Sequence, residues 1–339
     1  MGKSSRLLIG LGGQSNGDTV SEAVSENIKP DIVEAYLSGA GSGDWTTYNS
    51  PSGYYVQIVA QKAESVGAIP MYTLYGMAQN GEGNLSGLSS QSFMNTYWAN
   101  VKLMYQQIAV SGKPALVNVE PDFWGYTEGQ SNGQPAQMFA YVNSNSDCSD
   151  QPNNVIGIAG CVIEMARKYA PKAYVGFPPS DWGNTTAQVV AYMNTIGAQN
   201  ADFIVAQTLD RDAGCDEVQA SDCTASNGPW YWDESNQTHP NFQDHLTQVQ
   251  AYHTGIGNLP VVWWQTPEGV PSSSPGGTPY HYRDNRVSYF LTHPSELTAV
   301  GGLGVVFGNG GANQTDISTD GGQFQQLSGQ YFASPTPLP

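Results

Sequence analysis

The chain has 339 residues, of which 39% are hydrophobic, so it can bury one large core or two ordinary ones. Its 29 acidic residues outweigh 12 basic ones and give a net charge of -17. This balance argues against nucleic acids and anionic membranes as partners, because binding their phosphates requires clustered Lys and Arg.

Apolar segments with strand-like composition recur along the whole chain. The predicted strands are 6–12, 31–38, 69–76, 115–120, 173–177, 203–210, 260–266 and 303–307. Helical periodicity is found between them, at 54–66, 93–110, 161–169, 187–196, 242–252, 286–291 and 294–300. Eight strands alternating with helices predict a (β/α)8 TIM barrel, with a doubly wound open sheet as the alternative.

Long irregular segments follow most of the predicted strands. They are 39–50, 77–92, 121–154, 178–186, 211–240, 267–285 and 308–322. In a barrel, such segments are the loops that build the active face at the C-terminal ends of the strands. The glycine cluster at 10–17 lacks the Gly-x-Gly-x-x-Gly spacing of a dinucleotide site, so we expect a tight barrel loop there.

The four cysteines form two pairs that are close in sequence, Cys148 with Cys161 and Cys215 with Cys223. Neither pair has the Cys-x-x-Cys spacing of a zinc site, so we expect two local disulfides, with four reduced thiols as the alternative. Disulfides require an oxidising compartment. Together with a charged fraction of only 12%, they indicate a secreted, extracellular protein with a neutral polar surface.

Several carboxylates stand at the C-terminal ends of predicted strands. They are Glu120, Asp122, Asp210, Asp212 and Glu268. Because side chains alternate along a strand, Leu116, Asn118 and Glu120 are expected to share the inward face of the barrel. Two carboxyl groups that face a common cavity are what glycoside hydrolysis requires.

Aromatic residues gather at the same strand ends, where sugar rings could stack on them while amides and carboxylates bind the sugar hydroxyls. The residues expected to bind substrate are Tyr75, Asn118, Trp124, Trp182, Trp232, Trp264 and Gln265. For many of the aromatics the alternative role is packing of loops and core.

Two segments resemble the signature strands of the large retaining barrel clan of glycoside hydrolases. They are Val117-Asn-Val-Glu-Pro-Asp122 and Trp263-Trp-Gln-Thr-Pro-Glu268. The resemblance implies that Glu120 is the general acid/base and Glu268 the nucleophile.

A second resemblance leaves another pairing open. Glu120-Pro-Asp122 and Leu209-Asp-Arg-Asp-Ala-Gly-Cys215 are similar to elements of inverting cellulases of the cellobiohydrolase type, in the reverse order along the chain. This implies Asp210 or Asp212 as the partner of Glu120. The whole chain also looks like an uncharacterised group of secreted bacterial domains, which implies no particular activity.

We therefore expect a single (β/α)8 catalytic domain over 6–333, preceded at 1–5 by a remnant of an expression tag and followed at 334–339 by the start of a Pro/Thr-rich linker. The expected activity is hydrolysis of a neutral or cationic polysaccharide, because a strongly acidic protein should repel uronates. Glu120 would act with Glu268 or Asp210, and Asp122 is a further catalytic candidate.

No cofactor, metal, nucleic acid or membrane is expected to bind. The expected partners are the polysaccharide and a linked carbohydrate-binding module, and the expected state is a monomer. The alternatives are a carbohydrate-binding barrel without catalysis and a metal-dependent hydrolase.

Overall fold

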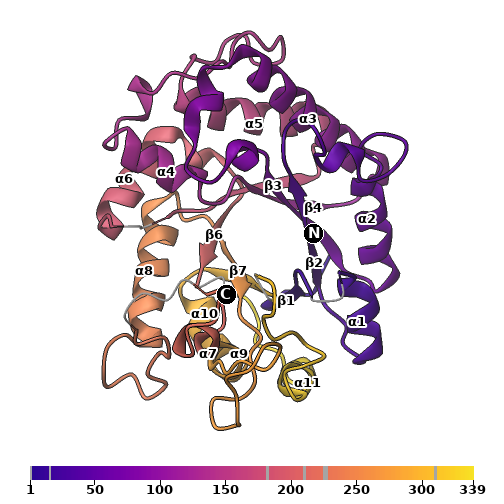
Figure 1. Ribbon diagram of the computed structural model, residues 1–339, viewed down its shortest axis with the longest axis vertical. Coiled ribbons are helices and arrows are strands. Elements are labelled where there is room, and N and C mark those ends of the chain that lie inside the picture. Colours follow the sequence, from indigo (N-terminus) through magenta and orange to yellow (C-terminus); the bar gives the residue numbers. More distant parts are fainter. Residues whose placement is uncertain (1, 15–16, 181–182, 209–210, 224–227, 309–310) are drawn as a thin grey trace.

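The computed structural model describes residues 2–14, 17–180, 183–208, 211–223, 228–308 and 311–339. Eight parallel strands close into a barrel in chain order, and β1 pairs with β8 to complete the ring (Figure 1). The strands are β1 (Leu8–Leu11), β2 (Ile32–Ser38), β3 (Ile69–Tyr75), β4 (Ala115–Val119), β5 (Ala173–Phe177), β6 (Phe203–Gln207), β7 (Val261–Thr266) and β8 (Gly302–Phe307). The predicted (β/α)8 barrel is confirmed, and the doubly wound alternative is not.

Helices surround the barrel in Figure 1 and cover its outer face. They are α1 (Thr19–Ser25), α2 (Tyr55–Ser65), α3 (Gln91–Ser111), α4 (Phe123–Gln130), α5 (Val155–Tyr169), α6 (Thr186–Ile196), α7 (Ala213–Glu217), α8 (Phe242–Gly255), α9 (Arg286–Thr292), α10 (Pro294–Ala299) and α11 (Gln323–Ala333). Their ends follow local sequence: α6 begins with a capping box between Thr185 and Gln188 and stops at Gly197, which has a φ of 88°.

Four helices, α1, α4, α7 and α11, were not predicted. Helix α4 has the sequence FWGYTEGQ, in which two glycines and the absence of an apolar stripe conceal the helix. Tertiary packing compensates, because Phe123, Trp124 and Thr127 of this helix are buried.

Inside the barrel, apolar side chains that come only from strands pack against one another, among them Ile32, Met71 and Leu116. Side chains two positions further along a strand share the same face and lie nearer its C-terminal end. At those positions the three strands carry Glu34, Thr73 and Asn118, all buried. The barrel interior is therefore apolar towards the N-terminal ends of the strands and polar towards its C-terminal mouth.

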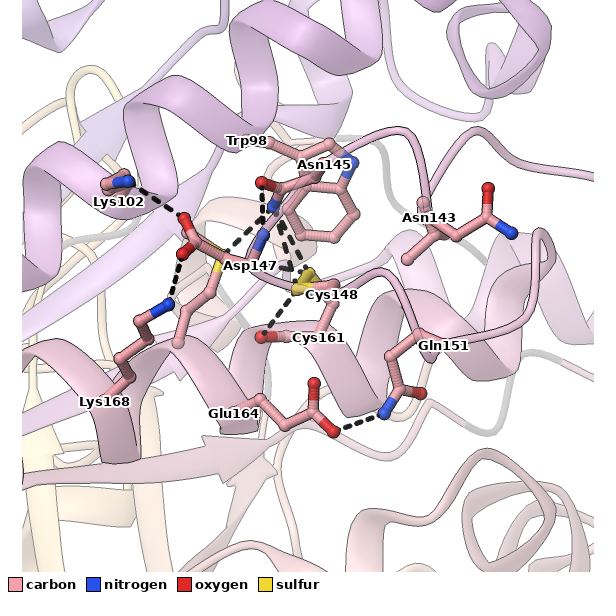
Figure 2. Close-up of a disulfide and its surroundings, with 12 residues drawn as sticks. Trp98, Lys102, Asn143, Asn145, Asp147, Cys148, Gln151, Cys161, Glu164 and Lys168 are labelled. Atoms are coloured by element: carbon pink, nitrogen blue, oxygen red, sulfur yellow. Dashed lines mark hydrogen bonds and ion pairs between the residues drawn. A yellow bond between two sulfur atoms is a disulfide. The ribbon is translucent and has the colours of Figure 1, made fainter.

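Two disulfides hold the loops, as predicted. Cys148 is bonded to Cys161 of α5, with their Cα atoms 5.3 Å apart (Figure 2), and Cys215 is bonded to Cys223, with their Cα atoms 5.9 Å apart. Beside the first disulfide, the carboxylate of Asp147 lies between two lysines of α3 and α5, Lys102 at 3.0 Å and Lys168 at 2.6 Å. This bridge and the paired charges anchor the long loop after α4 to the helix layer.

The segment 334–339, which we expected to begin a linker, hydrogen bonds to the start of the chain. Leu7 N donates to Thr336 O at 3.2 Å, and Leu338 N donates to Ser5 O at 3.1 Å. Among the described residues, no helix combines the length and apolar character that crossing a membrane requires.

Candidate active site

A cavity of about 360 Å³ lies at the C-terminal end of the barrel, between the ends of β4, β5 and β6 and one face of α8. Its volume falls in the range of small-molecule sites, about 300–1,000 Å³. The lining includes two carboxylates, Asp122 and Glu82, the guanidinium of Arg211, the ring of His245, and neutral polar side chains. These polar residues are Ser180, Gln207, Thr208 and Gln248. We call this space the first cavity.

Asp122 is the predicted catalytic residue that the structure brings to this cavity. It directly precedes α4 and has a φ of 68°, a left-handed conformation that is uncommon outside glycine. The hydroxyl group of Tyr75 lies 3.2 Å from Asp122 Oδ2 and 2.9 Å from Glu82 Oε1, so one phenol faces two carboxylates. Burial and these two negative charges raise the pKa of Tyr75, which keeps the hydroxyl protonated as a donor.

Glu120 has a different environment from the one expected. Strand β4 ends at Val119, and a φ of 51° at Glu120 breaks the alternation that would have aligned it with Asn118. Its carboxylate is 0% exposed and accepts hydrogen bonds from Gly76 N at 3.0 Å and Met77 N at 2.9 Å. Burial raises the pKa of Glu120 to about 8, partly offset by these two donors.

The neighbours of Glu120 show that it lies against the helix layer. The side chain of Tyr97, from α3, lies beside the carboxylate and favours its ionised form. Tyr97 and Met77 both belong to the hydrophobic core between barrel and helices. Through its hydrogen bonds to Gly76 and Met77, Glu120 thus connects the segment after β3 to that core.

Glu268 is also buried, at the end of β7. Gln14 Nε2 donates to Glu268 Oε1 at 2.9 Å, and Gln14 Oε1 accepts from Ile317 N at 3.2 Å. Burial holds the pKa of Glu268 well above its ordinary range, and the nearby carboxyl group of Asp320 adds to the shift. The buried Glu268 is therefore part of a hydrogen-bonded network that connects the loops after β1, β7 and β8.

Asp212, the last carboxylate noted at a strand end, is buried as well. Its Oδ2 accepts from Thr315 N at 3.3 Å, and its own N–H donates to Gln314 Oε1 at 2.9 Å. Burial and the neighbouring Asp284 hold the pKa of Asp212 well above its ordinary range. The predicted residues Asp210 and Trp182 lie outside the described residues.

The described tryptophans that were predicted to bind substrate lie in three different environments. Trp124 is 1% exposed, packs edge-on against Phe177 with ring centroids 5.0 Å apart, and donates Nε1–H to Val119 O at 2.8 Å. It therefore has no free face for a sugar in this structure. Trp232 is half-buried, with its ring 4.8 Å from that of His245. Trp264 reaches the mouth and lines a second cavity.

This second cavity, of about 270 Å³, lies over the ends of β1, β2, β7 and β8. Its lining includes Glu34, Tyr36, Trp264 and Gln265. Glu34 is 3% exposed, and burial raises its pKa to about 7, partly offset by Thr73 and Trp264. Sequence analysis gave Glu34 no role, although a carboxylate within the strand sequence IVEAYLS was a usable signal.

Three side chains separate the two cavities, and we call them the bridge: Tyr36, Gln265 and Gln207. Gln265 Nε2 donates to the hydroxyl oxygen of Tyr36 at 2.6 Å, and Gln265 Oε1 accepts from Gln207 Nε2 at 3.1 Å. Gln207 lines the first cavity, whereas Tyr36 and Gln265 line the second. Gln265 has a φ of 51°, and backbone strain of this kind clusters at ligand sites.

Of the remaining predicted substrate-binding residues, Asn118 lies below the mouth, with its Nδ2 3.4 Å from Thr73 Oγ1. Tyr75 and Gln265 both reach the mouth itself. Within the described ranges, no group of three or more His, Cys, Asp or Glu side chains is placed to hold a metal ion.

No protein-family model and no curated protein matches the sequence. Solved structures do match the fold. A modular endo-β-1,4-mannanase of glycoside hydrolase family 26 from Cellulomonas fimi has a TM-score of 0.56 and 12% identity, over 97% of this chain and 71% of that one. The family 53 glycoside hydrolase catalytic domain from Ignisphaera aggregans has a TM-score of 0.51 and 8% identity, over 94% and 92%.

The virulence factor SghA, solved with the substrate analogue salicin, has a TM-score of 0.52 and 11% identity, over 96% of both chains. At such low identity these likenesses concern the fold and not the chemistry. The chain is a (β/α)8 barrel with distant structural similarity to the barrels of glycoside hydrolases.

Proposed function

We propose that this protein is a secreted glycoside hydrolase that cleaves a neutral or cationic polysaccharide at the mouth of the barrel. The observation that carries the proposal is the first cavity, whose wall carries Asp122, bonded to the Tyr75 hydroxyl, beside Arg211 and several neutral hydroxyl and amide groups. A carboxylate beside many neutral donors and acceptors suits a sugar, whose hydroxyls both donate and accept. The active face of barrel enzymes is this same end.

Asp122 takes the role of general base or nucleophile. It is half-buried at the cavity wall, and the Tyr75 hydroxyl orients the carboxylate through Oδ2. The net charge of -17 disfavours an anionic polymer, and within the cavity the two carboxylates, Asp122 and Glu82, outnumber the single arginine, Arg211. A neutral glycan or an amino-sugar polymer is therefore the preferred substrate class.

Glu120 and Glu268 do not share this cavity. For Glu120 to protonate a glycosidic oxygen, its carboxylate would have to leave the N–H groups of Gly76 and Met77. That exchange leaves two buried donors unpaired, at a cost of about 1–3 kcal/mol each. We therefore assign Glu120 a structural role and Asp122 the chemical one.

The test measures reducing ends released from neutral, amino-sugar and uronate polysaccharides by the wild type and by Asp122→Asn. Asp150→Asn is the matched control, because Asp150 is exposed and lines neither cavity. We expect turnover of a neutral or amino-sugar polymer, reduced about 10³-fold in Asp122→Asn and unchanged in the control. Equal rates in all three proteins would refute the role of Asp122.

A second candidate function is carbohydrate binding without catalysis. The observation that favours it is the complete burial of Glu120 and Glu268, the pair that the retaining-clan resemblance implies. In this case the wild type would bind a polysaccharide with no turnover, and Asp122→Asn would bind it as well. Isothermal titration with the same polymers separates the two functions.

A further inference from the structure

We infer that the second cavity is a binding site for a single neutral sugar unit, separate from the first cavity. This role goes beyond the proposed hydrolase function, because it requires binding and no cleavage of a bond. Two features of the cavity support it: the glycines that make its space, and two buried polar atoms that lack a partner.

The space comes from glycines at one level of the barrel. Gly10 of β1 lies beside Ile32 of β2 in the strand register. Two positions further along, the same faces carry Glu34 on β2 but only Gly12 after β1, and Gly308 follows β8 beside it. A Cβ at Gly12 would be 2.9 Å from Glu34 Oε2, so any larger residue there would displace the carboxyl group.

Two polar atoms of residues that line this space have no hydrogen-bond partner among the described residues. They are Glu34 Oε1 and Trp264 Nε1. Glu34 is 3% exposed and Trp264 2% exposed, and the indole lies close enough to favour the ionised form of the carboxyl group. An unpartnered buried polar atom costs free energy unless a ligand or water satisfies it. An acceptor and a donor thus lie near each other at one wall of the cavity.

This combination selects the ligand. The N–H of Trp264 needs an acceptor, and Glu34 Oε1 needs a donor. A hydroxyl group is both, whereas an ammonium group only donates and an anion only accepts. Burial raises the pKa of Glu34 to about 7, so this wall is largely uncharged in mildly acidic solution. A neutral ligand with hydroxyl groups therefore fits it best.

The rest of the lining suits the body of a sugar ring. The cavity measures about 270 Å³, whereas one water molecule needs roughly 10–15 Å³, so a single bridging water does not fill it. The rings of Tyr36 and Trp264, with centroids 5.8 Å apart, and the side chain of Val306 give an apolar wall for the C–H groups of a sugar. The bridge lies between this cavity and the first one, so the space holds one unit and not a continuous chain.

The experiment titrates free monosaccharides into the protein at about pH 6 and follows binding by ligand-observed NMR. The neutral probes are glucose, galactose, mannose and xylose, with glucosamine and glucuronate as the cationic and anionic counterparts. Trp264→Phe removes the unpartnered N–H and keeps an aromatic ring. Trp45→Phe is the matched control, because Trp45 is also buried, has an Nε1 without a partner among the described residues, and lines neither cavity.

We expect a neutral monosaccharide to bind the wild type. Its Kd should rise about tenfold in Trp264→Phe, because one hydrogen bond is lost, and stay unchanged in Trp45→Phe. If Trp264→Phe does not fold, Glu34→Met removes the acceptor instead, and the same rise is expected. An unchanged Kd in the folded variant, or binding confined to the charged probes, would overturn the inference.

The location of the sugar and the proposed chemistry are tested separately. Monosaccharide binding that is lost in Asp122→Asn and kept in Trp264→Phe would place the sugar in the first cavity and overturn the inference. A wild type that binds a monosaccharide through Trp264 but hydrolyses no polysaccharide refutes only the hydrolase function. An active wild type that binds no neutral monosaccharide refutes only the second site.

Discussion

The substitution Glu120→Gln tests whether Glu120 is a structural residue. The carboxylate accepts N–H bonds at both oxygens, from Gly76 and from Met77. An amide offers one acceptor and places an NH₂ group against the other donor. One buried N–H then loses its partner, which costs about 1–3 kcal/mol of the free energy of unfolding.

The pH dependence of this loss has a definite sign. The pKa of Glu120 rises from 4.5 to about 8 on folding, so the folded state holds a proton that the unfolded state releases. Its contribution to stability is complete below the unfolded pKa and is lost as pH rises through the folded pKa. The wild type should lose roughly 1.4 kcal/mol per pH unit at this site over that window, on the order of 5 kcal/mol in all.

The assay is urea unfolding of both proteins at pH 5, 6.5 and 8. The other buried carboxyl groups are common to both, so the difference between the two free energies isolates Glu120. We expect the variant to be the less stable protein at pH 5 and the gap to close or reverse by pH 8. A difference that does not change with pH would refute the burial argument.

Three further outcomes follow from the packing. Replacing Cys148 and Cys161 together by alanine should lower the free energy of unfolding by about 3 kcal/mol, measured by urea unfolding against a wild type without reductant. Trp124→Ala should cost about 3–5 kcal/mol yet leave polysaccharide affinity per folded molecule unchanged, because its ring lies in the core; weaker binding by folded protein would contradict this. Tyr75→Phe removes the hydroxyl beside Asp122 and should lower kcat about tenfold with little change in stability, and unchanged kcat would show that Tyr75 does not position Asp122.

The fold was predictable because it depends on a pattern repeated eight times. Strands β5 and β8 carry continuous apolar runs, and several helices have clear starts and stops, such as α6 with its capping box. Helix α4 was not predictable, since only tertiary burial stabilises a segment with two glycines. The disulfides followed from cysteine spacing alone.

The site was predictable only in part, because one backbone angle decides which carboxylate faces the mouth. Positive φ values at Glu120 and Asp122 turn the chain at the end of β4, so that Asp122 lines the cavity and Glu120 does not. Strand alternation cannot anticipate such a turn in residues other than glycine. Trp124 lies in the core, and not at the cavity, for the same reason. The turn begins α4, and the start of this helix sets the direction of the Trp124 side chain.

Glu34 shows the converse case. A single carboxylate in an apolar strand is visible in the sequence, but its meaning depends on Gly12, which lies on another strand and makes room for it. Contacts between β1 and β2 exist only once these two strands have paired. Sequence periodicity therefore predicted the inward face and not the site built on it.

The most direct test of the account is the rate of reducing-end release at pH 6 from a neutral or amino-sugar polysaccharide by three folded proteins. They are the wild type, Asp122→Asn and Glu120→Gln. We predict turnover by the wild type, a loss of about 10³-fold in Asp122→Asn, and at least about a tenth of the wild-type rate in Glu120→Gln. An inactive but folded Glu120→Gln beside an active Asp122→Asn would contradict the assignment of the chemistry to the mouth of the barrel.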